Sequence, residues 1–348
     1  MRVLSVRHLT TYRYAEPVEL GEHRMMFRPR ESHDLRLIRA RLDITPRPAA
    51  LRWLHDVFDN SVAVANFDGT TTWLRFDSMV TLEHVETSLP DYALQPTARS
   101  FPFNYPQDEW LDLAPALQRP EPTAEVDRWA AQFVPESPSA ASTIGTMDLL
   151  RAMAFGIRRQ FRYIRRVERG VQSPIETLRH ASGTCRDFAW LMIDAVRSLG
   201  LAARFVSGYI FVPGPDSGSI ANRASAAAPI SADAPHSVAA ALPIAAPLPV
   251  AAPLPIAAPP PIAAPLPIAE GGATHAWLQV YLPGAGWVDF DPTNSIIGNR
   301  NLIRVAVAWS PMQVLPLWGT YVGTARSCLG MQVAVSVTEE PCHINSPA

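Results

Sequence analysis

A proline-rich stretch at residues 217–270, with repeats such as PIAAPPPIAAPLPIA, constrains the fold of this chain more than any other feature. Proline fixes the backbone φ angle and supplies no N–H donor, so repeated proline excludes both a helix interior and a central strand. We therefore expect a disordered or polyproline-II spacer without a core of its own. A folded unit in this half of the chain has to be assembled from the segments on either side of the spacer.

The role of the spacer is open between two interpretations. It could dock a partner through a groove that recognises proline-rich ligands, or it could be an insertion tolerated in a surface loop. The tolerated insertion is the favoured interpretation. His236 lies inside the spacer and is discounted as a catalytic candidate for that reason.

Composition excludes several classes of function. The 30 basic and 32 acidic side chains give a net charge of 30 − 32 = −2, which leaves no electrostatic footprint for nucleic acid or an anionic membrane surface. Three cysteines (Cys185, Cys328, Cys342) are too sparse for a disulfide framework. No metal-ligand spacing, calcium loop or phosphate-binding glycine loop is present, so we expect no metal or cofactor.

The N-terminus lacks the apolar core of a secretory signal, and no unbroken apolar run of about 20 residues could span a membrane. We expect a cytoplasmic, reduced enzyme.

Residues 1–90 are predicted to form a β-rich domain such as a sandwich. The segments VLSVRHLTTYRY, LRLIRARLDITP and TTWLRFDSMVTLEHVE alternate in polarity and are bounded by turn sequences such as FDNS and FDGT. This region carries no clustered nucleophile, base or metal-ligand spacing, so we expect a scaffold or a module that positions substrate. Residues 91–122 are proline-rich and polar, which indicates a connection.

Residues 123–337 mix helical and strand patterns, which predicts an α+β domain interrupted by the spacer. Helices are expected over 123–163, where a Thr precedes the first helical residues, and over 184–199, where an apolar stripe ends at Gly200. Strands are expected at 203–212 and, after the spacer, in THAWLQVYLP and GWVDFDPTN, which the turn PGAGW would join. The stretches LIRVAVAW and LGMQVAVSV indicate further strands.

Cys185 is the strongest candidate for a nucleophile. It follows SGT and opens the helix predicted over 184–199. Backbone N–H groups at a helix N-terminus favour a thiolate and could contribute to an oxyanion hole. Gly183 would let the backbone approach a substrate closely. Taken alone, such a cysteine would be interpreted as a small buried hydrophobe, so its assignment depends on partners elsewhere in the chain.

His275, in THAWLQVYL, and Asp291, in WVDFDPTN, supply those partners. A thiolate needs a base that holds it as an ion pair and protonates the leaving amine, and the imidazole needs a carboxylate that fixes its tautomer. His275 follows Cys185 by 275 − 185 = 90 residues, and Asp291 follows His275 by 291 − 275 = 16. Two antiparallel strands joined by a short turn would place the histidine beside the aspartate.

Four neighbouring residues are expected to have other roles. Asp289 lies two residues before Asp291, on the same strand face, and is the rival carboxylate. Asp187 is expected to cap the helix start rather than to catalyse. Trp277 is equally compatible with lining a substrate cleft and with core packing. His180 is expected on the surface rather than as a base.

The segments SGTCRDFAWLMIDAVRSLGLAARFVSGYI and THAWLQVYLPGAGWVDFDPTN together resemble the core of bacterial transglutaminase-like proteins, within the papain-like cysteine-enzyme superfamily. This resemblance covers about residues 150–213 and 273–337. The segments YRYAEPVELGEHRMMFRPR and WLHDVFDNSVAVANF resemble the β-rich N-terminal region of the same family. The resemblance implies a β-rich N-terminal domain followed by a papain-like catalytic domain.

By the same resemblance the triad maps onto Cys185, His275 and Asp291, and Asp291 ranks above Asp289 because the family's acid lies in the DPT run. The implied activity is attack on a peptide or carboxamide substrate to form an acyl-thioenzyme. Resolution by water, the expected outcome for a bacterial member, gives a cysteine protease or amidase. Resolution by an amine would give a crosslinking protein-glutamine amine transferase. The competing hypothesis is a non-catalytic binding module whose spacer recruits a partner, and the intact triad argues against it.

Overall fold

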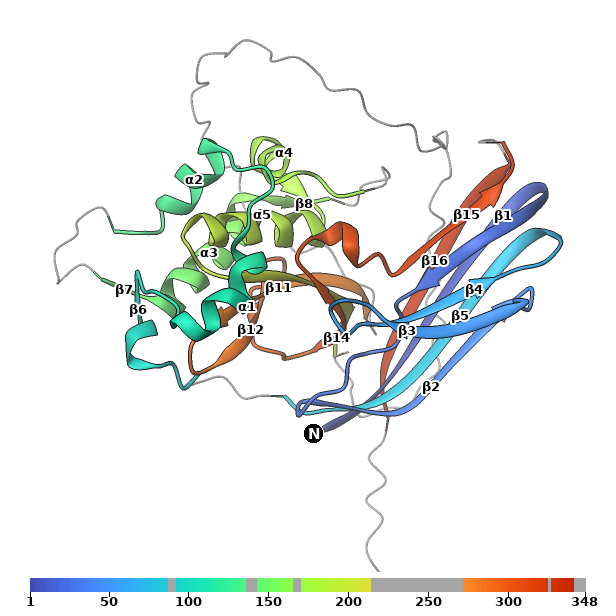
Figure 1. The fold of residues 1–348 in the computed structure, drawn as a ribbon, viewed down its shortest axis with the longest axis horizontal. Helices are drawn as coiled ribbons and strands as arrows, with labels where there is room; N and C mark the ends of the chain where they lie inside the picture. The colour runs from blue at the N-terminus through green and yellow to red at the C-terminus, as the bar shows by residue number, and fades with distance from the viewer. Residues whose placement is uncertain (87–91, 136–142, 165–169, 214–271, 325–326, 341–348) are drawn as a thin grey trace, which may run out of the picture.

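The computed structural model describes residues 1–86, 92–135, 143–164, 170–213, 272–324 and 327–340. Within these ranges a long, strongly curved sheet stands beside a smaller sheet that is covered by helices (Figure 1). The spacer predicted at 217–270 lies outside the described residues. No described helix is both long and apolar enough to cross a membrane.

The larger sheet is built around β1, a strand of 24 residues. Alternate residues at its start, from Leu4 and Val6 onward, are buried, which is the period-two pattern of a strand with one face in a core. The path of the sheet is β2-β5-β1-β4-β3, with β15 and β16 also paired to β1. Its strands are β1 (Arg2–Met25), β2 (Leu35–Thr45), β3 (Ala50–His55), β4 (Ser61–Asn66), β5 (Thr70–His84), β15 (Leu317–Val322) and β16 (Cys328–Glu340). The three strands expected in this region are present, and the structure adds β3 and β4.

The C-terminal strands of this sheet differ from the expected arrangement. The sequence grouped LGMQVAVSV with the domain of residues 123–337, whereas β16 runs antiparallel to β1, with Val337 opposite Val6. The strand is mostly exposed on one side, and of its residues only Val337 is fully buried. Such a half-exposed strand satisfies its backbone by pairing with the free side of β1. The chain therefore returns to its first sheet after it has built the second.

The smaller sheet has the order β13-β12-β11-β10-β14, with every pair antiparallel. The turn between β11 and β12 contains Gly284 (φ 92°) and is followed by Gly286 (φ 72°), both in the left-handed region that favours glycine. This is the hairpin expected from PGAGW. The strands are β10 (Ala203–Ile210), β11 (Ala273–Leu282), β12 (Gly286–Asp291), β13 (Ile296–Ile297) and β14 (Leu302–Ala308).

Most of the helices gather on one side of this smaller sheet (Figure 1), whereas the helix of residues 107–117 contacts Tyr281 and Trp287. Those predicted over 123–163 and 184–199 are present, whereas α1 was not predicted, since the proline-rich segment 91–122 was interpreted as a connection. Pro115 lies inside α1. The helices are α1 (Gln107–Leu117), α2 (Ala124–Ala131), α3 (Thr146–Gln160), α4 (Pro174–His180) and α5 (Cys185–Ser198), with the 3-10 turns η1 (Pro96–Ala98) and η2 (Pro311–Gln313) and the two-residue strands β6 (Ser100–Phe101), β7 (Ile144–Gly145), β8 (Arg162–Tyr163) and β9 (Ser182–Gly183).

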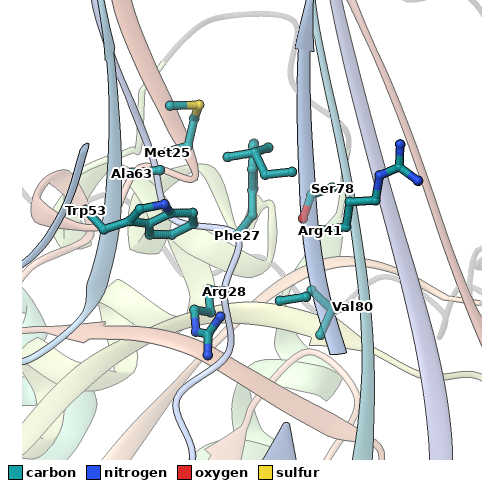
Figure 2. Close-up of a pocket in the computed structure, with 10 residues that line it drawn as sticks. Met25, Phe27, Arg28, Arg41, Trp53, Ala63, Ser78 and Val80 are labelled. Carbon is teal, nitrogen blue, oxygen red and sulfur yellow. The ribbon is translucent and has the colours of Figure 1, made fainter. Parts of the chain in front are cut away.

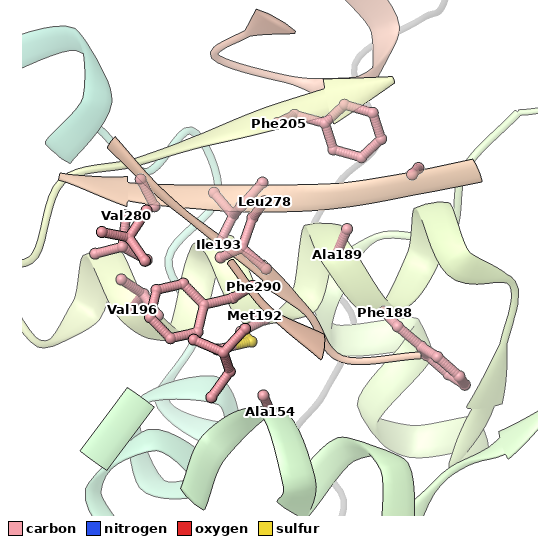
Figure 3. Packing of buried hydrophobic residues seen from close by; sticks show 14 of the residues in the cluster. Ala154, Phe188, Ala189, Met192, Ile193, Val196, Phe205, Leu278, Val280 and Phe290 are labelled. Atoms are coloured by element: carbon pink, nitrogen blue, oxygen red, sulfur yellow. The ribbon is translucent and has the colours of Figure 1, made fainter. Parts of the chain in front are cut away.

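The apolar stripe of α5 is the centre of the main core. Side chains from the helix pack directly against one face of the smaller sheet (Figure 3). Burying each large apolar side chain stabilises the fold by about 1.5–3 kcal/mol, so this contact holds the helix firmly on the sheet. The participating residues include Phe188, Ala189, Met192, Ile193 and Val196 of the helix and Phe205, Leu278, Val280 and Phe290 of the sheet.

The two sheets are joined by side chains that bond to backbone across their boundary. Asn60, in the turn between β3 and β4, is fully buried. Its amide donates to the carbonyl oxygen of Val307 (2.8 Å) and accepts from the N–H of the same residue (2.9 Å). The amide thus occupies the place of a neighbouring strand beside β14.

We predict that Asn60→Ala lowers the free energy of unfolding by about 2–4 kcal/mol, because it leaves the N–H and the carbonyl of Val307 buried without partners. Urea denaturation would measure the change. Asn66→Ala is the matched control: Asn66 is exposed on β4, and its loss should cost about 0.5 kcal/mol or less. Equal effects of the two substitutions would contradict the proposed role of Asn60.

Candidate active site

Cys185 is the first residue of α5 and is partly exposed. The preceding residue, Thr184, is the N-cap and has extended backbone angles. Its backbone N–H (2.8 Å) and its hydroxyl (2.9 Å) both donate to Asp187 Oδ2, while the backbone N–H of Gln172 donates to Asp187 Oδ1 (2.7 Å). Asp187 is fully buried, so it caps and braces the helix start, as predicted.

Gly183 is required by packing next to this cap. A Cβ atom at this position would lie 2.8 Å from Cβ of Asp187, which is closer than side chains tolerate. The glycine therefore lets the short strand β9 pass directly over the first turn of α5. This steric reason stands beside the expected one, which was close approach of the backbone to a substrate.

Arg186 places a partly buried positive charge next to the thiol. Its Nη2 donates to the carbonyl oxygen of Pro311 (2.6 Å), and its guanidinium lies 5.0 Å from the centre of the Phe205 ring. Burial lowers the pKa of Arg186, and the charges of Cys185 and Asp187 act in the opposite direction. The sequence reasoning missed this residue, although an arginine directly after the candidate nucleophile was a visible signal.

His275 lies on β11 and is 7% exposed, and Asp291 lies at the end of β12 and is fully buried. His275 Nε2 donates to Asp291 Oδ2 over 2.7 Å. This bond leaves Nδ1 as the ring nitrogen available to a third group. The hairpin thus brings together the histidine and the carboxylate that the sequence paired.

The turn after β12 holds Asp291 as a carboxylate. The backbone N–H groups of Thr293 (2.9 Å) and Asn294 (3.3 Å) donate to its Oδ1, and Asn294 Nδ2 donates to its Oδ2 (2.7 Å). An aspartate that accepts from the backbone two and three residues later is the usual geometry of an Asx turn, for which the DPTN run was the available signal. Asn294 was not among the predicted site residues.

Cys185 lies close enough to His275 to raise the pKa of its imidazole, so the three predicted residues lie together in the structure. Burial disfavours a charged imidazole, but Asp291 and the thiol outweigh it and raise the pKa of His275 to about 10. Burial also opposes ionisation of Asp291, yet His275 and the donors of the turn hold the pKa of Asp291 below its usual value. The pair is therefore an imidazolium and a carboxylate around neutral pH.

The alternative residues have other partners. Asp289 accepts a hydrogen bond from Trp277 Nε1 (2.6 Å), while it is Asp291 that bonds to His275. Trp277 is fully buried and stacks on His275, so of its two expected roles core packing is the one the structure shows. His180 is exposed in the last turn of α4.

The described ranges hold no group of three or more His, Cys, Asp or Glu side chains that could bind a metal ion. A hollow in the larger sheet is lined on its apolar side by Met25, Phe27, Trp53 and Val80 (Figure 2). None of its lining residues belongs to the candidate site.

Comparison with known families gives two matches along the chain. Residues 4–83 match the bacterial transglutaminase-like N-terminal region, and residues 139–292 match the transglutaminase-like superfamily. The second match contains Cys185, His275 and Asp291.

Relatives with sequence similarity occur in mycobacteria. The chain is 28% identical to an uncharacterised protein of Mycobacterium tuberculosis (strain H37Rv) over 345 residues, covering 95% of this chain and 91% of the relative. It is 25% identical to an uncharacterised protein of Mycobacterium leprae over 166 residues, or 48% of this chain and 41% of that one.

A crystal structure from Cytophaga hutchinsonii, described as that of a proposed cysteine protease, shares the fold. It matches with a TM-score of 0.57 and 14% sequence identity, covering 97% of this chain and 98% of that one. At this identity the likeness concerns the fold alone, and it extends over both sheets.

We predict a specific pH dependence for the contribution of the buried pair to stability. Because the pKa of His275 is raised from 6.5 to about 10, its contribution is complete below pH 6.5 and is lost as the pH rises towards 10. Because the pKa of Asp291 is lowered from 3.8, its contribution is complete above that pH and is lost as the pH falls further. The difference in unfolding free energy between wild type and His275→Gln should therefore be largest between pH 3.8 and 6.5.

Urea titrations at several pH values would measure this difference. The matched control is His180→Gln, since His180 is exposed and its substitution should leave the pH profile unchanged. A difference between wild type and His275→Gln that stays constant from pH 6 to 10 would contradict the assigned ion pair.

Proposed function

We propose that this chain, whose residues 139–292 match the transglutaminase-like superfamily, is a cysteine protease or amidase with the triad Cys185, His275 and Asp291. The substrate is a peptide, a protein or another carboxamide. One observation carries the proposal: the partly exposed thiol at the start of α5 acts on the pKa of a buried histidine, and that histidine is hydrogen-bonded to a buried carboxylate.

The geometry supports acylation of the thiol. His275 holds the proton and Cys185 the negative charge of an ion pair, and the sulfur attacks the carbonyl carbon of the substrate. The C–N bond breaks, the departing nitrogen takes the proton from His275 Nδ1, and a thioester remains on Cys185. The bond from His275 to Asp291 keeps the imidazole in the orientation that both proton transfers need.

The N-terminus of α5 is placed to stabilise the negative charge that develops on the substrate oxygen during the proposed reaction. Cys185 is the first helical residue, where helix geometry leaves backbone N–H groups without intrahelical acceptors. In the proposal its N–H donates to the oxygen that becomes negative in the tetrahedral intermediate. Asp187 contributes by fixing the turn in which this N–H stands.

Water completes the proposed reaction. A water molecule attacks the thioester carbonyl while His275 accepts its proton, the C–S bond breaks, and the acid product leaves the Cys185 thiolate paired with the protonated His275. An amine in place of water would give a new amide by the same steps.

We predict that iodoacetamide labels Cys185 at neutral pH at least tenfold faster than it labels a simple thiol, because His275 maintains the thiolate. The rate should fall to that of a simple thiol in His275→Ala. The experiment uses the full chain with Cys328→Ser and Cys342→Ser, so that Cys185 is the remaining cysteine. The proposal is wrong if wild type and His275→Ala react at the same rate.

We further predict that a glutamine-containing peptide library incubated with the enzyme yields hydrolysed or deamidated products. Mass spectrometry with water alone, and with an added primary amine, would identify them. Cys185→Ala is the matched control and should form no product. If most products contain the added amine instead of the oxygen of water, the assigned reaction would be amine transfer and not hydrolysis.

A further inference from the structure

The hairpin of β11 and β12 contains two carboxylate bonds of the same geometry. Its register pairs Leu278 with Phe290, so His275 meets Asp291 diagonally. Two residues later on β11 and two residues earlier on β12, Trp277 meets Asp289 in the same diagonal relation. In both cases a ring N–H on β11 donates to an aspartate on β12, at 2.7 Å and 2.6 Å. The second bond has no part in the proposed proton transfers.

The indole of Trp277 is fixed on the sheet from two sides. Its ring stacks on the imidazole of His275, with the centroids 6.0 Å apart and the planes at 22°. Gly208 of β10 lies opposite His275, and a Cβ atom there would lie 2.8 Å from the Trp277 Cη2 atom, so the indole rests against bare backbone. The indole has one polar atom, and the Asp289 bond satisfies it in a fully buried position. Rotation of the ring would break that bond.

Asp289 is itself held by a cation that reaches the larger sheet. Its Oδ2 lies 3.9 Å from Nη1 of Arg304 on β14. Nη2 of Arg304 donates to Asp34 Oδ1 (3.1 Å) and to Ser32 Oγ (2.9 Å), both in the segment between β1 and β2. The side chains of Asp289 and Arg304 are 8% and 14% exposed, so solvent screens their attraction weakly.

We propose that Asp289 is a positioning residue that acts on His275 through Trp277, and that Arg304 and Asp34 extend this support to the larger sheet. The inference rests on the proposed function, since it concerns the orientation of the base. Asp289 fixes the indole, and the indole limits rotation of the imidazole that stacks on it. His275 then keeps Nε2 towards Asp291 and the other nitrogen towards Cys185.

Such a role predicts that loss of the bond between Asp289 and Trp277 lowers the reaction rate of the Cys185 thiol, although all three residues of the triad remain. Small displacements of a catalytic group can cost up to about a hundredfold in rate, so Asp289→Ala should slow iodoacetamide labelling at neutral pH by about tenfold or more. Its pH–rate profile should shift towards that of a simple thiol. Asp289→Asn retains an oxygen that can accept from Trp277, and it should recover most of the rate.

The experiment uses the full chain with Cys328→Ser and Cys342→Ser and measures labelling from pH 5 to 10. Trp277→Phe removes the donor instead of the acceptor and should show a similar loss, which keeps the test valid if Asp289→Ala does not fold. The two losses should not add in the double variant, because they remove one bond. Asp34→Asn should give a smaller loss in the same direction.

Asp194→Ala is the matched control for destabilisation alone. Asp194 is buried on α5 and forms paired bonds with Arg119 (2.8 Å each), so its loss removes two charge-assisted hydrogen bonds and leaves Arg119 paired with Asp127 alone. It should lower the stability and leave the labelling profile unchanged.

The outcomes separate this inference from the proposed function. If wild type labels no faster than His275→Ala, both are overturned. If labelling depends on His275 but the folded variants Asp289→Ala and Trp277→Phe retain the wild-type profile, the positioning role alone is overturned. A shift produced equally by Asp194→Ala would also overturn it.

Discussion

The packing of α5 on the smaller sheet is the contact on which the candidate site depends. Cys185 stands on the helix, whereas His275 and Asp291 stand on the sheet, so their distances are set by how these two elements meet. Apolar side chains of the helix interdigitate with those of β10, β11 and β12. Close-packed cores resist small displacements, so this packing fixes the position of the α5 N-terminus relative to His275, near the start of β11.

The two aspartates of the hairpin, Asp289 and Asp291, are both buried, and burying a carboxylate charge costs several kcal/mol unless it is paired and hydrogen-bonded. Asp291 obtains its bonds from His275 and from a turn of its own chain, through Thr293 and Asn294. The structure therefore compensates the charge locally, within a few residues of the hairpin. Asp289 is compensated differently: it bonds to Trp277 and lies near Arg304, which reaches the larger sheet.

This connection gives the N-terminal sheet a closer relation to the site than its sequence indicated. The sequence showed a β-rich region without catalytic side chains, and scaffolding was the expected role. In the structure Asn60 replaces a strand beside β14, and β16 returns to β1 after the smaller sheet is complete. The first and last described strands are thus neighbours, and the smaller sheet is inserted between them along the chain.

Local sequence patterns were enough to predict the secondary elements around the site, including α5, the hairpin and its glycine turn, because periodicity, capping and turn chemistry act over a few residues. It also identified the three residues that the structure brings together, although the pairing with Asp291 came from a resemblance. Asp289 and Asp291 share a strand face, and local pattern could not choose between them. The folded structure was needed to show that Asp291 bonds to His275 while Asp289 accepts a hydrogen bond from Trp277. It was also needed to show that β16 pairs with β1. These choices depend on strand register and on contacts between residues far apart in the chain, which no local pattern encodes.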